Sequence, residues 1–139
     1  MAHRRELAAL ALVLALVAGG CASGGLRPEH WLVCEFERLK VDDTADEVRW
    51  TYDLTLRNKG KQSAELIHGF ATVVLGSVRR SPDQVIGRRA IAPGETYRVP
   101  HTVIVRRAEL ADPQALMVKW QILGRYQDGY PIIAEVEVR

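Results

Sequence analysis

The chain has 139 residues, of which 47% are hydrophobic and 26% charged, and its formal net charge at neutral pH is +2. This length suits a single domain. The near balance of charge excludes a protein that binds nucleic acid through bulk positive charge, so we expect no nucleic-acid partner.

The first twenty residues have the three-part layout of a secretory signal peptide. Arg4 and Arg5 make the start positive, residues 7–17 form an uninterrupted apolar run, and small residues follow. A membrane-spanning helix needs about 20 apolar residues, which is more than this run provides. We therefore predict a signal-peptide helix over residues 1–20 that is removed on export.

The run from Ala18 to Cys21 (AGGC) resembles the lipobox of bacterial lipoproteins, although Ala18 stands where leucine is common. The resemblance implies cleavage before Cys21, a diacylglycerol on the Cys21 sulfur and an acyl chain such as palmitate on the new amine. Two or three acyl chains anchor a protein firmly to a membrane. The resemblance also implies a lipid-anchored protein of the cell envelope. Ala22, where an aspartate would retain the protein at the inner membrane, favours the outer membrane facing the periplasm.

Residues 21–29 are rich in glycine and small side chains, which predicts a lipidated, flexible tether before the domain. Lipid on Cys21 excludes a disulfide within the chain and leaves Cys34 as the single thiol of the mature protein. We expect Cys34 to pack as a small hydrophobic residue, with a reactive or intermolecular thiol as the alternative.

Residues 30–139 predict an all-β domain. Residues 48–57 alternate without exception between apolar and polar side chains, which is the period of a strand with one buried face. Turn signals separate the other expected strands, which cover residues 31–41, 65–74, 85–91, 96–105, 116–123 and 130–138. Residues 107–111 are the only helical candidate in this part. About seven short strands predict an immunoglobulin-like β-sandwich.

Two motifs support the same class. The run YDLTLRN from Tyr52 to Asn58 and the run IAPGET from Ile91 to Thr96 resemble small exported immunoglobulin-like domains of the FxLYD type. In that family a strand ending in Leu-x-Asn precedes a loop, and a Pro-Gly-Glu-Thr turn leads into the next strand. The family carries no catalytic residues, so the resemblance implies no site residue here.

The search for chemistry finds no nucleophile elbow and no phosphate-binding loop, so we expect no enzyme and no cofactor. His68 and His101 each interrupt an apolar strand face and could share a metal only if their strands were neighbours. The favoured interpretation is that each makes one hydrogen bond, which leaves no metal site.

Three arginine pairs form a possible basic contact rim for anionic head groups, wall polymer or an acidic partner. The six residues are Arg79, Arg80, Arg88, Arg89, Arg106 and Arg107. The first two pairs flank residues 81–84, so they could share one hairpin. The favoured interpretation is that the arginines are solvated charges that guard exposed strand edges.

These observations predict a membrane-tethered envelope lipoprotein that acts as a non-enzymatic adaptor or assembly component for another envelope protein, in an unknown pathway. The alternative is a small-ligand or metal carrier that uses His68 and His101.

Overall fold

The computed structural model describes residues 27–28, 31–110 and 112–139. The predicted signal peptide, Cys21 and the tether apart from residues 27–28 lie outside the described residues. Within the described ranges there is no helix with the length and hydropathy to cross a bilayer.

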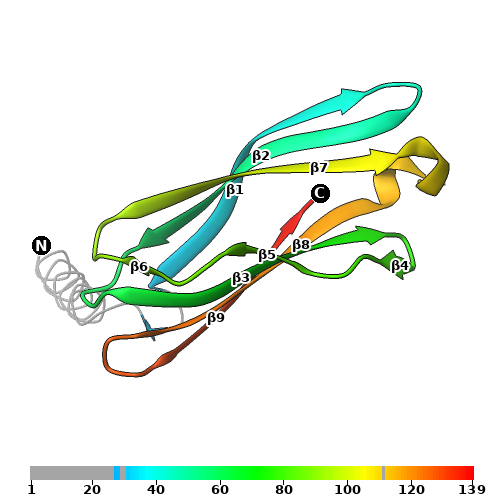
Figure 1. Ribbon diagram of the computed structural model, residues 1–139. Coiled ribbons are helices and arrows are strands. Elements are labelled where there is room, and N and C mark those ends of the chain that lie inside the picture. The colour runs from blue at the N-terminus through cyan, green and yellow to red at the C-terminus, as the bar shows by residue number, and fades with distance from the viewer. Residues whose placement is uncertain (1–26, 29–30, 111) are drawn as a thin grey trace, which may run out of the picture.

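Two antiparallel sheets lie face to face (Figure 1). Sheet A has the order β1-β2-β7, and sheet B has β4, β5 and β6 beside β3, followed by β8 and β9. The strand bounds are β1 Leu32–Asp43, β2 Glu47–Asn58, β3 Ala64–Leu75, β4 Val78–Arg79, β5 Asp83–Ile86, β6 Arg89–Ile91, β7 Thr96–Arg106, β8 Leu116–Tyr126 and β9 Pro131–Val138. The chain crosses between the sheets after β2, β6 and β7. This confirms the predicted immunoglobulin-like β-sandwich.

One strand position of sheet B is filled by three short pieces. β4, β5 and β6 pair in succession with the end, middle and start of β3. The sequence predicted one weak strand over residues 85–91, but β5 ends at Ile86 and β6 begins at Arg89. Pro82, which lacks a backbone N–H, lies between β4 and β5 and cannot donate to a ladder. Counting the three pieces as one gives seven strand positions in the described chain.

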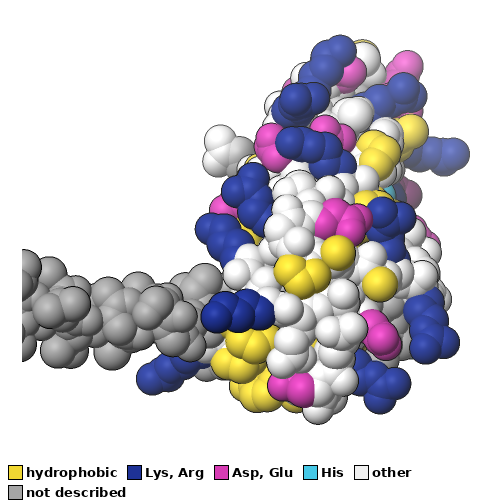
Figure 2. Space-filling model, turned by 90° about the vertical axis from the view of Figure 1, so that its left-hand side faces the viewer, with side chains coloured by type: hydrophobic (Ala, Val, Ile, Leu, Met, Phe, Trp, Pro, Cys, Tyr) yellow, Lys and Arg dark blue, Asp and Glu magenta, His cyan; other side chains and the backbone are white. Residues whose placement is uncertain are grey.

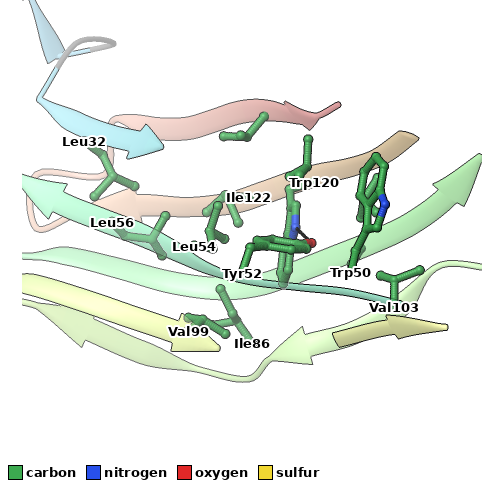
Figure 3. Close-up of a cluster of buried hydrophobic side chains, with 14 of the residues drawn as sticks. Leu32, Trp50, Tyr52, Leu54, Leu56, Ile86, Val99, Val103, Trp120 and Ile122 are labelled. Atoms are coloured by element: carbon green, nitrogen blue, oxygen red, sulfur yellow. Dashed lines mark hydrogen bonds between the residues drawn. The ribbon is translucent and has the colours of Figure 1, made fainter. Parts of the chain in front are cut away.

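The core lies between the sheets and follows the alternation of β2. Figure 3 shows Tyr52, Leu54 and Leu56 of β2 facing Trp120 and Ile122 of β8. All five side chains are almost completely buried. Removing apolar surface from water stabilises a fold by roughly 25 cal/mol per Å², so this interlocked layer is the main source of stability.

Asn58 is a fully buried polar residue at the end of β2. Its side-chain amide donates to the carbonyl oxygens of Gln62 at 2.7 Å and Ile91 at 2.9 Å. Its side-chain oxygen accepts from the backbone N–H of Gly60, and its backbone carbonyl accepts from the N–H of Gly94. Asn58 thus fixes the crossing from β2 to β3 and binds it to the turn before β7.

The helical candidate over residues 107–111 forms only a 3-10 turn, η2 Arg107–Glu109, and a second, η3 Pro113–Ala115, follows before β8. Leu110 is already extended, so the turn ends there. A segment this short cannot recover the cost of starting an α-helix.

Candidate functional site

The two candidate metal ligands lie on different sheet faces. His101 of β7 pairs with Tyr52 and shares its inward face. His68 of β3 precedes Gly69 and Ala71 by one and three residues, and both are buried against the core, so His68 faces outward. Trp120 of sheet B lies against the His101 ring, with 5.0 Å between ring centroids, so sheet B separates the two histidines. Within the described residues there is no group of three His, Cys, Asp or Glu that could hold a metal.

His68 instead contacts its own sheet. Its Nδ1 lies 3.2 Å from the side-chain nitrogen of Gln84 on β5, and its ring packs beside Phe70. The favoured interpretation of His68, a half-buried histidine with one hydrogen bond, matches this geometry.

His101 ends a hydrogen-bonded chain that runs between the sheets. The indole N–H of Trp120 donates to the Tyr52 hydroxyl at 2.7 Å, and that hydroxyl lies 2.8 Å from Nδ1 of His101 (Figure 3 draws the Trp120–Tyr52 bond). An indole N–H can only donate, so the Tyr52 oxygen accepts there. The Tyr52 hydroxyl can donate to Nδ1 of a His101 ring that is protonated on Nε2, or accept from a ring that is protonated on Nδ1.

Burial favours the neutral form of both ionisable side chains in this hydrogen-bonded series, His101 and Tyr52. It lowers the pKa of His101, and the nearby Asp83 carboxylate opposes that shift only in part. Burial also raises the pKa of Tyr52 to about 12, against the smaller opposing effect of the Trp120 hydrogen bond. Burial thus favours the neutral form of both groups, and the hydrogen-bonded contacts join sheet A to sheet B.

Cys34 is the other residue singled out for chemistry. It lies on β1 opposite Leu56, packs against the core and is a free cysteine. Burial, helped by the charge of Glu35, raises the pKa of the Cys34 thiol to about 12. The thiolate is the reactive form of cysteine, and with this pKa Cys34 stays a protonated thiol at neutral pH. This agrees with the expectation that Cys34 packs as a small hydrophobic residue.

The first two arginine pairs, which the sequence allowed to share one hairpin, lie far apart. Arg79 pairs with Val74 near the end of β3, whereas Arg89 pairs with Leu66 near its start. Eight residues of strand separate these positions, which is about 26 Å. Arg106 pairs with Glu47, at the same end of the sandwich as Arg79 (Figure 1). The predicted rim is therefore divided between the two ends of the domain.

One arginine of each pair has a structural contact. Arg80 donates to the carbonyl oxygen of Ile104 and to Glu109, and Arg107 donates to the carbonyl oxygen of Thr44. The guanidinium of Arg89 lies 3.9 Å from the centroid of the Tyr97 ring. Three arginine side chains make no hydrogen bond or ion pair with any described residue, namely those of Arg79, Arg88 and Arg106. Only these three remain available for an outside partner.

The structure shows a surface feature that the sequence analysis missed. A shallow pocket of about 180 Å³ lies where the described chain enters the sandwich and is lined mainly by apolar side chains. Pro28, Tyr130, Pro131 and Ile133 are among its lining residues, and Ile133 is 72% exposed. The sequence feature that could have indicated this apolar surface is the adjacent pair Ile132 and Ile133. Neighbours on a strand face opposite ways, so one of the two had to point outward.

No family model matches the chain, and no curated protein sequence matches it. Among solved structures, a structural-genomics target known as SoR45 has a TM-score of 0.54 at 13% identity, over 81% of this chain and 89% of that one. A Bordetella pertussis protein assigned the name ApaA has a TM-score of 0.48 at 18% identity, over 80% of this chain and 96% of that one. At 13% identity the likeness to SoR45 shows the fold alone.

A β-glucosidase from Kluyveromyces marxianus is similar to this chain with a TM-score of 0.31 and 13% identity. The similarity covers 78% of this chain and only 14% of the enzyme. So small a share of a much larger enzyme establishes no enzymatic activity for this chain.

Proposed function

We propose that the chain is a lipid-anchored lipoprotein of the bacterial envelope, held by Cys21 at the outer membrane, and that its sandwich is a non-enzymatic adaptor for another envelope protein. The observation that carries the proposal is the placement of Cys21. The cysteine follows an apolar leader and small residues, and it stands eleven residues before Leu32, the first residue of β1. A short tether between a lipidated cysteine and a folded domain accounts for this spacing.

The architecture of the sandwich suits an adaptor. The inward faces of both sheets are occupied by close-packed side chains, and His101, Tyr52 and Cys34 are held neutral within that packing. Contacts with other molecules then fall to the outer faces and the two ends. The end farthest from residue 28 carries Val78, which is 60% exposed, together with Arg79 and Arg106. This combination of an exposed apolar side chain and uncommitted guanidinium groups fits an acidic protein surface.

Lipid attachment is tested on the full chain expressed in a bacterium that processes lipoproteins. We expect radiolabelled palmitate in the protein and a mass equal to residues 21–139 plus acyl groups. The Cys21→Ala variant should remain unlabelled and retain its leader. Cleavage at another position, or an unlabelled wild-type chain, would contradict the proposal.

The adaptor role is tested in the same cells with a photo-crosslinking amino acid at Val78, and with Ile133 as the matched exposed position at the opposite end. We expect one envelope protein to be captured from Val78 and not from Ile133. Its capture should be weaker when Arg79 and Arg106 are both changed to glutamine. Equal capture from both positions, or none, would argue against an adaptor that uses this end.

A further inference from the structure

The apolar pocket lies at the end of the sandwich from which the tether leaves. Its lining includes Pro28 itself, together with Tyr130 and Ile133. Tyr130 is 40% exposed and Ile133 is 72% exposed, and both are large apolar side chains. Figure 2 looks onto this end and shows a group of hydrophobic side chains low on the molecule, with others scattered above it. Tyrosine and isoleucine side by side at a protein surface are typical of contact with the head-group region of a bilayer.

Basic residues adjoin this apolar group. Arg27 precedes Pro28 in the chain. The backbone N–H of Lys59 donates to the carbonyl oxygen of Trp31 at 2.7 Å, and Arg125 pairs with Pro131 across the β8–β9 ladder. All three side chains are exposed. Two acidic residues lie nearby, namely Asp128 in the β8–β9 turn and Glu65, which pairs with Arg125 on β8. The three basic residues outnumber them, so these five side chains together carry a charge of +1, which suits anionic lipid.

The tether limits how far this end can be from the lipid. Pro28 is seven residues after Cys21. Seven residues span at most about 25 Å even when fully extended. The sandwich is longer than that, since the twelve residues of β2 alone extend for about 40 Å. An anchor on Cys21 thus holds the apolar group near the bilayer, while the opposite end, with Val78, can lie farther from it.

We propose that this end of the sandwich docks on an anionic bilayer surface, with Tyr130, Pro131 and Ile133 at the level of the head groups and with Arg27, Lys59 and Arg125 against lipid phosphates. This inference rests on the proposed lipid anchor and adds a second contact to it. The acyl chains supply the attachment, and the apolar and basic groups set the orientation. Two or three acyl chains suffice for firm attachment, so the docking contact acts on the orientation of the domain.

The test uses the full chain, purified from membranes in its lipidated form and reconstituted into vesicles. One set of vesicles contains phosphatidylcholine alone and the other also contains phosphatidylglycerol, each with brominated phosphatidylcholine as a quencher of tryptophan fluorescence. The Ile133→Trp variant reports from the docking end, and the Val78→Trp variant is the matched exposed control at the opposite end. The native tryptophans give the same background in both.

We expect quenching of the Ile133→Trp variant to exceed that of the Val78→Trp variant several-fold on anionic vesicles, and to fall in high salt, which screens charge. Changing Lys59 and Arg125 together to glutamine should reduce that quenching, whereas changing Arg79 and Arg106 together should leave it unchanged. Equal, weak quenching of both reporters on a chain that floats with the vesicles would overturn the docking and leave the anchor intact. A wild-type chain that does not float with the vesicles would overturn both.

Discussion

The side-chain amide of Asn58 donates a hydrogen bond of 2.9 Å to the carbonyl oxygen of Ile91, which joins the end of β2 in sheet A to the end of β6 in sheet B. The Asn58→Asp variant keeps the shape of the side chain but replaces the donating NH₂ with an acceptor. Two carbonyl oxygens then lose their partner, and a buried charge is added. We expect the free energy of unfolding to fall by about 3 kcal/mol or more, measured by urea unfolding at neutral pH.

The matched control for Asn58 is Gln114→Glu, the same amide-to-acid change at an exposed position. Its unfolding midpoint should shift little, because surface substitutions usually change stability by about 0.5 kcal/mol or less. Equal changes in the free energy of unfolding for the two variants would show that the buried hydrogen bonds of Asn58 do not stabilise the link between β2 and β6.

The pKa of His101, lowered mainly by burial, makes stability depend on pH. Above the ordinary histidine value of about 6.5, the ring is neutral in both the folded and unfolded states and adds nothing. As pH falls below that value, the unfolded state binds the proton and the folded state does not. The free energy of unfolding should therefore decrease as pH falls below about 6.5 and level off below the folded-state pKa.

The effect of His101 is measured by urea unfolding between pH 8 and pH 5, a range around the ordinary histidine pKa. The proteins compared are the wild type, His101→Gln and His68→Gln. The His101→Gln variant should lose much of the decrease, and His68→Gln, on the outer face of sheet B, should keep it. A wild-type decrease that persists in the His101→Gln variant would assign the pH dependence to other groups.

The high pKa of the Cys34 thiol predicts slow chemistry in the folded protein. Thiolate is the nucleophile, and very little is present at pH 8 when the pKa is about 12. A chromogenic disulfide reagent should find almost no reactive thiol in the native, membrane-extracted chain and one thiol after denaturation. Two thiols after denaturation would mean that Cys21 carries no lipid, and rapid reaction in the native state would mean that Cys34 is accessible.

Gly69 of β3 packs directly against β5. A Cβ atom at this position would lie 2.7 Å from the Cβ of Ile86, a contact that the ladder can relieve only by shifting β5. We expect Gly69→Ala to lower the free energy of unfolding by roughly 1–3 kcal/mol. A Cβ at Gly87 would meet no atom within 4 Å, so Gly87→Ala is the control, and its thermal unfolding midpoint should stay close to that of the wild type.

Strands with one buried face were predictable from the sequence, and the short ones were not. β2 was predicted over residues 48–57 and extends over Glu47–Asn58, because from Val48 to Arg57 each inward residue is apolar and each outward residue is polar. β4 has two residues, both exposed, and therefore has no alternation to detect. It exists because the turn at Gly76, which has a positive φ, folds the chain back onto the end of β3.

The candidate sites were harder to predict for a similar reason. The period of a strand tells which residues share a face but not which sheet the strand joins. His68 and His101 both lie on apolar runs, yet their strands belong to different sheets and only His101 points into the core. The grouping of Pro28, Tyr130 and Ile133 depends on contact between the entry segment and β9, which are about a hundred residues apart in the chain.

The division of one strand position among β4, β5 and β6 has a consequence for self-association. A neighbouring molecule that tried to extend sheet B on that side would find no piece longer than four residues, with Pro82 and Gly87 in the gaps. Broken edges of this kind are poor templates for cross-β stacking. A lipid anchor would concentrate many copies in two dimensions, where accidental strand exchange between neighbours is most frequent. The interrupted edge would then keep this side of sheet B from being extended by a neighbouring molecule.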